Sequence, residues 1–594
     1  MKQEIHLRVA ALRSRMSDMG IDALIVPTTD PHASEYTPDH WKQRQWLTGF
    51  DGSAGTAVVT LREAALWTDS RYFLQAGEQL TDTPFALMKD GMADTPSITQ
   101  WLASVLSDGN VVGVDATVNT IADCRQWENE LKYKHIDLKL CDDPFNGLWG
   151  SRPSLPQHPI EIHPLKYAGR SVGEKLQGAR RAMAEANADA LLVTQLDEVA
   201  WLTNLRGDDV QCTPVFLSFL LVRQDEARLY VNAPSPLLQE YCKRENLALC
   251  SYTEFYNELR NSDIRRLMLD PSVSNAAIGE ALPTGCVMVE KTSPIALMKA
   301  VKNEQEIAGF RQAMLYDGVA MVRFLRWLQS AVKEGGMTEL GASRKLRNLR
   351  EEQPTFRDLS FDTISAYGAH AAIVHYEPTE ATDIELKTSG FLLLDSGGQY
   401  ECGTTDITRT IPLGTLTEQE RRDYTLVLKG HIRLALARFP QGTTGTQLDV
   451  LARYAMWQEG INYGHGTGHG VGSRLSVHEG PHQIRMQWRP TPLQEGMTVT
   501  NEPGIYRAGS HGIRIENTML VTHHSTTDFG TFLQLEALTL CPIDLQPVLL
   551  DLLSADEVTY LNAYHRHVFE QLHPLLADED EREWLRQATA EIIK

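Results

Sequence analysis

The first third of the chain alternates between helix-like and strand-like patterns of apolar residues. Residues 4–19 have helical spacing and end at a glycine. Short apolar runs that we interpret as buried strands lie at 23–27, 46–50, 56–60, 65–69 and 111–115. Runs of this length bounded by turn residues are typical of strands, and their alternation with helical segments predicts a mixed α/β domain.

This pattern occurs a second time after a linker. Four prolines between residues 153 and 164 prevent regular structure there. Beyond them the runs at 22–26, 46–50 and 112–115 are echoed, in the same order, at 189–193, 201–205 and 267–270. Short apolar strands can look alike, but three ordered matches favour a duplication. We therefore expect one domain at 1–155 and a related one at 156–298.

The pattern changes again near residue 299. Apolar residues close to the helical period predict a long core helix over residues 299–328. Ser554 and Glu557 form a capping box that begins another helix. That helix carries one apolar stripe, which could pack on the third domain or form a subunit interface: Leu561, Tyr564, Val568 and Leu572. We expect a third domain at 299–540 and a C-terminal extension at 541–594.

Composition narrows the class of protein. At 594 residues the chain exceeds the roughly 250–300 at which single cores stop growing. A net charge of −21 argues against nucleic acid as a partner, because phosphate binding needs a basic face. The longest apolar run, 215–222, is too short to span a bilayer. The start lacks the apolar core of a signal peptide, and eight sparse cysteines indicate reduced thiols. These features predict a cytoplasmic protein without membrane or nucleic-acid partners.

The candidate chemistry lies between residues 391 and 516. Four acids and one histidine stand beside glycine or at the end of an apolar strand: Asp395, Asp406, His469, Glu502 and Glu516. Taken alone, each fits a turn or loop residue. Together, carboxylates on apolar strands resist burial unless a cation neutralises them. Four negative charges suit two divalent ions, and oxygen ligands with a single nitrogen favour Mn²⁺, Co²⁺ or Zn²⁺.

The order of these five residues and their local motifs resemble the pita-bread metallopeptidases, which include methionine aminopeptidase, prolidase and aminopeptidase P. The motifs are GHGTGHGVG at 464–472, TNEPG at 500–504 and GIRIEN at 512–517. The resemblance implies an α/β and α+β protein with two creatinase-like N-terminal α/β domains. A pita-bread catalytic domain and a helical C-terminal extension would follow them.

The resemblance also implies a ligand set. Asp395 would bind one ion, His469 and Glu502 the other, and Asp406 and Glu516 would bridge both. The ions would be Mn²⁺, with Zn²⁺ or Co²⁺ as alternatives. Two such ions would hold a bridging hydroxide that attacks a peptide carbonyl.

Further residues are assigned to the site by the same resemblance. His375 and His478 would bind the scissile carbonyl or the developing gem-diolate, and His469 would also face the substrate. Glu502 would relay a proton. Arg71 lies in a stretch, 66–73, that resembles the part of aminopeptidase P whose arginine reaches the substrate. A solvated arginine after a strand is the alternative.

Three residues are expected around these groups. Arg514 would orient Glu516 or another carboxylate from outside the ligand set. His465 would lie just behind the ligands, and His482 would line the substrate cleft.

Two long N-terminal domains favour the long, cytosolic aminopeptidase P type within the family. That resemblance implies hydrolysis of the bond between any first residue and a proline in second position, by a homodimer. Bonds before proline have restricted geometry, which makes a dedicated peptidase plausible. Two alternatives remain: a dipeptidase of prolidase type, and a metal-free pita-bread protein that serves as a binding scaffold.

Overall fold

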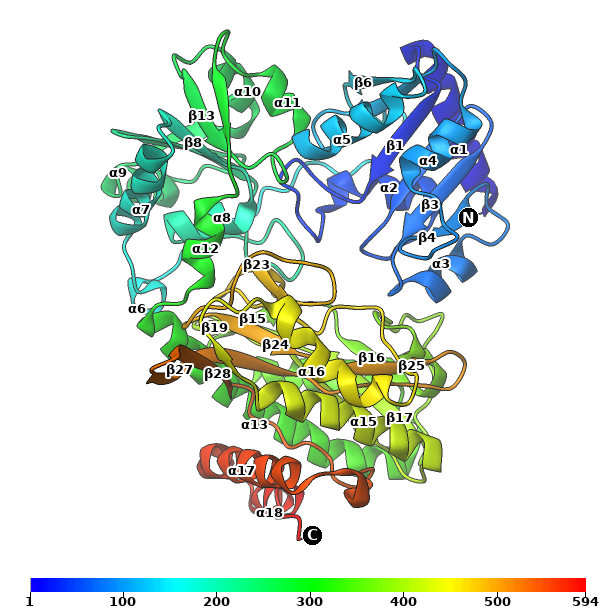
Figure 1. Ribbon diagram of the computed structural model, residues 1–594, viewed down its shortest axis with the longest axis vertical. Coiled ribbons are helices and arrows are strands. Elements are labelled where there is room, and N and C mark those ends of the chain that lie inside the picture. Colours follow the sequence, from blue (N-terminus) through cyan, green and yellow to red (C-terminus); the bar gives the residue numbers. More distant parts are fainter. Residues whose placement is uncertain (1, 594) are drawn as a thin grey trace. The chain divides into compact units, whose positions relative to one another are not determined.

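The computed structural model describes residues 2–593 (Figure 1). It forms two compact units, Met1–His163 with Arg170–Ala296 and Pro164–Gly169 with Leu297–Lys594. Within residues 2–593, every helix is too short or too polar to cross a membrane. All eight cysteines are free thiols, in agreement with the expectation from their spacing.

The first unit begins with a six-stranded sheet of order β4-β3-β2-β1-β5-β6. β1 pairs antiparallel with β2 and parallel with β5. The strands are β1 (Ala23–Pro27), β2 (Thr56–Thr60), β3 (Ala64–Thr68), β4 (Ala86–Lys89), β5 (Val111–Asp115) and β6 (Asp137–Cys141). The helices are α1 (Lys2–Met19), α2 (Gln43–Thr48), α3 (Phe73–Gln79), α4 (Ile98–Val105) and α5 (Ile121–Lys132).

A second sheet in the same unit has the corresponding order β12-β11-β10-β8-β13-β14. β8 pairs antiparallel with β10 and parallel with β13, as β1 does with β2 and β5. The strands are β8 (Ala190–Val193), β10 (Ser218–Arg223), β11 (Ala227–Val231), β12 (Ala248–Ser251), β13 (Arg266–Leu269) and β14 (Val287–Glu290). The helices are α7 (Val172–Glu185), α8 (Leu196–Thr203), α9 (Pro236–Arg244), α10 (Phe255–Arg260) and α11 (Ala276–Glu280). Two sheets of equal order and strand direction are what a duplication produces.

One expected strand is wrong in both copies. Residues 46–48 end helix α2, and residues 201–203 end helix α8. Gly49 and Asn204 then adopt left-handed backbone conformations, with φ of 75° and 51°. A left-handed residue after the last turn is a common helix end. The error arose because periodicity cannot distinguish a short apolar strand from a buried helical turn.

The second unit contains the long helices and the remaining sheets. Asn303 caps α13 (Glu304–Glu334) through a capping box with Glu306, so the core helix predicted from residue 299 begins later. The other helices are α6 (Leu165–Ala168), α14 (Glu339–Glu351), α15 (Glu418–Ala435) and α16 (Gly445–Trp457), and α12 (Pro294–Ala300) precedes α13. The site strands are β16 (Ile364–Tyr367), β17 (Phe391–Ser396), β20 (Ile407–Pro412), β22 (Gly468–Gly470), β23 (Glu479–Ile484), β24 (Thr498–Asn501), β25 (Gly504–Arg507), β26 (His511–Arg514) and β27 (Asn517–Thr527). β17 lies between β16 and β20, and β24 pairs with β27.

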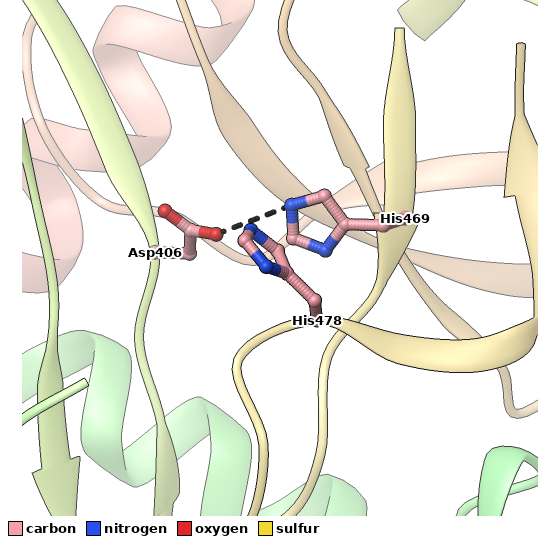
Figure 2. A group of neighbouring side chains, drawn as sticks. All are labelled: Asp406, His469 and His478. Carbon is pink, nitrogen blue, oxygen red and sulfur yellow. Dashed lines mark ion pairs between the residues drawn. The ribbon is translucent and has the colours of Figure 1, made fainter. Parts of the chain in front are cut away.

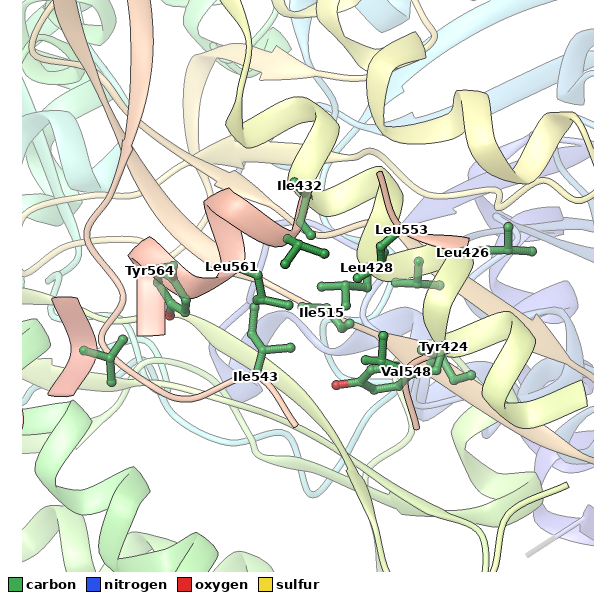
Figure 3. Packing of buried hydrophobic residues seen from close by; sticks show 14 of the residues in the cluster. Tyr424, Leu426, Leu428, Ile432, Ile515, Ile543, Val548, Leu553, Leu561 and Tyr564 are labelled. Carbon is green, nitrogen blue, oxygen red and sulfur yellow. The ribbon is translucent and has the colours of Figure 1, made fainter. Parts of the chain in front are cut away.

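The C-terminal extension packs on this unit. It forms α17 (Ala555–Leu572), which Ser554 and Glu557 cap as expected, and α18 (Glu579–Ala588). The apolar stripe of α17 is buried, and it joins one core cluster with Leu428 and Ile432 of α15 and with Ile515 (Figure 3). Of the two possibilities left open by the sequence, packing on the third domain is the one observed.

Arg409 of β20 links the extension to the sheet. Its side chain is buried, and its guanidinium donates to the carbonyls of Pro542 and Glu516 at 3.0 and 2.6 Å. It also donates to the Tyr564 hydroxyl of α17 at 3.0 Å, and that hydroxyl donates to the Cys541 carbonyl at 2.9 Å. A buried guanidinium is tolerated only when its donors are paired. The extension therefore completes the hydrogen bonding of a strand in the middle of the unit.

Removing the Tyr564 hydroxyl should destabilise the protein. We expect Tyr564→Phe to lower the free energy of unfolding by about 1–3 kcal/mol, because buried partners lose a hydrogen bond. Tyr560, one turn earlier on α17, is the matched control, since its buried hydroxyl has no partner among the described residues. Tyr560→Phe should leave stability unchanged. Urea unfolding followed by circular dichroism measures both, and equal losses would contradict the role of Arg409.

Candidate metal centre

Asp395 and Asp406 come from neighbouring strands. Asp395 lies near the end of β17, where it pairs in register with Thr408 of β20, and Asp406 stands directly before β20. Both are buried, 8% and 3% exposed. The antiparallel pairing of β17 and β20 thus brings together two acids that are eleven positions apart in the sequence.

The two glutamates lie beside strands that are not part of the β16-β17-β20 sheet. Glu502 follows β24, and its backbone N–H donates to the Thr467 carbonyl at 2.8 Å. Glu516 lies between β26 and β27, and its N–H donates to the Thr408 carbonyl at 3.1 Å. The Thr408 hydroxyl also donates to Glu516 Oε2 at 2.8 Å. Backbone and side-chain bonds therefore fix Glu516 against the strand that follows Asp406.

His469 belongs to the short strand β22. A Cβ on its neighbour Gly468 would lie 1.9 Å from the Thr500 carbonyl oxygen, so only glycine permits this close approach to β24. The His469 N–H donates to the Thr500 hydroxyl at 3.1 Å. The ring Nε2 lies 3.5 Å from Asp406 Oδ2 (Figure 2). It lies 3.5 Å from Glu502 Oε1 as well. The glycines around His469 thus bring its ring to the acids.

The five residues offer their ligand atoms to one small volume. In each of three groups, the potential ligand atoms lie within 4.8 Å of one another. The groups are Asp395, Asp406 and Glu516; His469, Glu502 and Glu516; and Asp406, His469 and His478. The structure therefore brings together the five residues singled out by the sequence, and it adds His478 to their neighbourhood.

The electrostatics of this cluster favour cations. Burial, followed by the charge of Asp395, raises the pKa of Asp406 well above its ordinary value. Burial and then the charge of Asp406 do the same to the pKa of Glu516. Burial is also the main cause that raises the pKa of Glu502 to about 7, against the opposing effect of Arg514. Carboxylates in this arrangement are hard to ionise together without added positive charge.

Arg514 supplies part of that charge to one acid. Its Nε and Nη2 donate to Asp395 Oδ2 at 3.0 and 2.6 Å. Of the two roles open to it from the sequence, it orients a carboxylate other than Glu516. The second oxygen of Asp395, Oδ1, is buried and has no hydrogen-bond partner among the described residues. An orphaned carboxylate oxygen on a residue grouped with Asp406 and Glu516, beside a second group of His469, Glu502 and Glu516, fits two divalent cations with mainly oxygen ligands.

The two other histidines lie on loops. The ring of His478 packs edge-on against that of His469, with centroids 4.3 Å apart (Figure 2). His375 lies in a turn after β16. Arg514 Nη2 donates to the preceding carbonyl, that of Val374, at 3.3 Å. The next residue, Tyr376, is buried and donates to Glu339. Hydrogen bonds of the residues directly before and after His375 thus fix the turn that carries it.

His465 lies where the sequence placed it, but His482 does not. His465 Nδ1 is 4.0 Å from Glu502 Oε2, and its Nε2 lies 2.8 Å from the Tyr506 hydroxyl. His482 is 0% exposed and bonds the Thr498 carbonyl at 2.7 Å. Burial lowers the pKa of His482 to about 4, so it is a neutral core residue and lines no cleft. Gly480 and Pro481 directly before it made it look like an exposed loop residue.

Arg71 is placed in the first unit. Its Nε and Nη2 donate to the two carboxylate oxygens of Asp69 at 2.9 and 2.7 Å. This bidentate pair fixes the guanidinium after β3, so Arg71 is not a freely solvated side chain.

Three contributors to the site were missed from the sequence. Thr408 holds Glu516, Thr500 donates to Glu502 Oε1 at 3.4 Å, and the Tyr506 hydroxyl accepts from Arg514 Nη1 at 2.7 Å. Thr408 and Thr500 each stand two residues from a candidate ligand, which on a strand means the same face. That spacing was a usable signal. Tyr506 carries no comparable signal.

Family comparisons cover most of the chain. Residues 308–523 match the description "Metallopeptidase family M24", and residues 531–592 match "C-terminal region of peptidase_M24". Residues 8–143 and 151–306 each match "Creatinase/Prolidase N-terminal domain". The predicted fold class is therefore confirmed, including the two related N-terminal domains.

Similar proteins match over nearly their whole length. The chain is 41% identical to "Probable Xaa-Pro aminopeptidase P" of Laccaria bicolor, over 98% of this chain and 92% of that one. It is 40% identical to "Xaa-Pro aminopeptidase 1" of Dictyostelium discoideum, over 97% and 94%.

Two solved structures have informative coverage. The X-prolyl aminopeptidase of Caenorhabditis elegans, described as a cytosolic enzyme with a di-nuclear active site, is 35% identical with a TM-score of 0.95. It covers 99% of this chain and 100% of its own. The Xaa-Pro dipeptidase of Bacillus anthracis is 25% identical with a TM-score of 0.52. It covers all of its own chain but only 64% of this one.

Replacing one buried acid should abolish the response of the protein to metal. We expect Mn²⁺ to raise the thermal midpoint of the wild-type protein, since a ligand at 100 times its Kd stabilises by about 2.7 kcal/mol. Asp406→Asn should lose this rise, and in chelator it should be at least as stable as wild type, because one buried negative charge is gone. Differential scanning fluorimetry measures both midpoints.

The control for this experiment is Asp528→Asn, on the exposed loop that follows β27. It should retain the full metal response. A wild-type response in Asp406→Asn would remove this residue from the metal centre.

Proposed function

We propose that this chain, which belongs to metallopeptidase family M24, hydrolyses the bond between the first residue of a peptide and a proline in second position. The observation that carries the proposal is the complete set of four acids and one histidine in a single partly buried cluster. The curated relatives that share nearly the whole length of the chain are named as Xaa-Pro aminopeptidases.

The alternatives drawn from the sequence have less support. The Bacillus anthracis dipeptidase leaves more than a third of this chain unmatched, whereas the Caenorhabditis elegans aminopeptidase matches nearly all of it. A metal-free scaffold would have no need for clustered acids whose burial is costly. The aminopeptidase is therefore the better supported function.

The site fits two divalent ions, and we assign Mn²⁺ to it as the finer proposal. Asp395 would hold one ion, His469 and Glu502 the other, and Asp406 and Glu516 would be shared. Such a pair of ions supplies an activated water near neutral pH and an electrophile for the peptide carbonyl. The di-nuclear site in the description of the Caenorhabditis elegans enzyme supports the number of ions.

The residues of the chain contribute binding, orientation and proton transfer. His375 and His478 donate hydrogen bonds to the carbonyl oxygen as negative charge develops on it. His469 faces the substrate as well as the acids. Glu502 accepts a proton from the attacking water and passes it to the departing proline nitrogen. Arg514 orients Asp395, and His465 lies behind Glu502.

Some assignments stay predictions from the sequence. They are the substrate contact of Arg71 and the domain boundaries at residues 155, 298 and 540. A cytoplasmic location is a proposal too, supported by the eight free thiols and by the cytosolic description of the Caenorhabditis elegans enzyme.

We also propose a homodimer. Helix α16 exposes an apolar face in which Val450, Tyr454 and Trp457 are 40%, 60% and 39% exposed. Their spacing of four and three residues places them on one side of the helix. A face of this kind supports an interface between two copies of the chain.

A pair of peptides tests the function. We expect release of arginine from Arg-Pro-Pro, with added Mn²⁺, and loss of that activity with chelator. Arg-Ala-Pro is the matched control and should resist cleavage, because its second residue is not proline. Amino-acid analysis of the products measures this. Cleavage of Arg-Pro without cleavage of Arg-Pro-Pro would favour a dipeptidase, and cleavage of neither would refute the proposal.

Charge on the exposed face of α16 tests the assembly. We expect wild-type protein at micromolar concentration to sediment as a dimer and Trp457→Glu to sediment as a monomer, because a buried unpaired carboxylate is costly. Sedimentation velocity measures both. A substitution on an exposed loop, Phe529→Glu, is the control and should leave the dimer intact. A monomeric wild type would contradict the proposal.

A further inference from the structure

A buried carboxylate follows His478 directly. The side chain of Glu479 is 0% exposed, and both of its oxygens are bound by lysines. Lys299 Nζ lies 2.7 Å from Oε2, and Lys302 Nζ bonds Oε1. The two lysine side chains are themselves 3% and 0% exposed. Three charged groups are thus removed from water at one point, where both lysines pair with the one carboxylate.

The lysines come from the beginning of the second unit. Lys299 lies in the last turn of α12, and Lys302 precedes the cap of α13. Lys302 Nζ also donates to the Lys299 carbonyl at 3.0 Å, and its backbone N–H donates to the Gly496 carbonyl at 2.9 Å. Residue 496 leads into β24, the strand that Glu502 follows. The segment that clamps Glu479 therefore rests on the same part of the fold as a candidate ligand.

The backbone of Glu479 is fixed from the opposite side. It pairs with Gly470, next to His469, at a point where the register of β22 and β23 shifts. A Cβ on Gly470 would lie 2.5 Å from the Glu479 carbonyl oxygen, so the two strands are in close contact there. His478 directly precedes the paired residue Glu479, and its ring lies against that of His469.

We infer that Glu479 is a positioning residue: with Lys299 and Lys302 it fixes the loop that holds the His478 ring at the metal centre. The inference rests on the proposed function, in which His478 donates to the substrate carbonyl. The His478 ring is held by neighbours in space and by the direction of its own backbone, and Glu479 sets that direction. Without the clamp, the loop loses the side-chain anchor closest to His478.

A purely structural role is the competing reading, because buried ion pairs also occur far from any site. Glu557 provides that case in the same unit. Its side chain is 0% exposed, and Lys429 and Arg433 bind its two oxygens at 2.8 and 2.7 Å. It has the same chemistry as Glu479, one carboxylate between two cations, but it caps helix α17 in the C-terminal extension. The chain thus contains its own control.

A double-mutant cycle separates the two readings. We expect Glu479→Gln to lower kcat for Arg-Pro-Pro by about 10- to 100-fold, the usual effect of losing a partner that orients a site residue, with KM changed little. In the His478→Ala background the same substitution should lower kcat by no more than about twofold, because its target is absent. Glu557→Gln should lower the thermal midpoint but leave kcat unchanged. Equal losses from Glu479→Gln in both backgrounds would overturn the inference.

A spectroscopic measurement makes the test independent of turnover. With carbon-13 at histidine Cε1, the signal of His478 is identified by its absence in His478→Gln. We expect this signal to shift or broaden in Glu479→Gln and to stay in place in Glu557→Gln. An unchanged signal in Glu479→Gln would overturn the inference even if no peptide is cleaved. Failure of the proposed function alone would abolish hydrolysis and leave the change in the signal.

The lysines provide a second route if Glu479→Gln fails to fold. Lys299→Gln keeps Lys302 on the carboxylate, so it should fold and produce a smaller change in kcat and in the His478 signal, in the same direction. Metal content by plasma mass spectrometry should stay at the wild-type value in every one of these variants. A loss of metal that accounts for the loss of kcat would overturn the inference.

Discussion

The burial of several carboxylates beside one another is the condition on which the rest of the second unit depends. Like charges in a poorly solvated space repel, and the chain itself offsets only part of this, through Arg514 on Asp395. Burial first, and then the charges of neighbouring acids, raise the pKa values of Asp406 and Glu516 well above their ordinary range. Each acid is therefore fixed by strand pairing or by a neighbouring donor. Before cations bind, the acids repel one another, so the surrounding strands and donors must keep them in position.

The surroundings of the site repeat one device. His375 and His478 are each followed by a buried residue that bonds a residue far away in the sequence. Tyr376 donates to Glu339, and Glu479 is held by Lys299 and Lys302. In both cases the anchor comes from a helix or helix end near the start of the unit. Loops outside the regular strands can thus hold site histidines in place because adjacent residues belong to the core.

The features that could be predicted from the sequence are those that a short local motif encodes. The five clustered residues stood in motifs of glycine and apolar strand, which are readable without a structure, and the capping box at Ser554 was equally local. The segment at 46–50 was misread as a strand because a short, mainly apolar run fits either a strand or a buried helical turn. Pairs distant in the sequence left no trace: Lys299 and Glu479 are 180 residues apart, and Arg514 and Asp395 are 119 apart. Only the fold can show which of many lysines meets which acid.

The hydrogen bonds of Arg409 also affect when this unit can complete its folding during synthesis. The guanidinium bonds the Glu516 carbonyl and the Asn517 side chain. Three further partners, at Cys541, Pro542 and Tyr564, lie later in the chain. During synthesis on the ribosome, the Arg409 guanidinium therefore lacks these three partners until α17 has been made. The centre that contains Glu516 can reach this packing only after residues 541–572 have been made, so a chain that stops before α17 would lack these bonds behind the site.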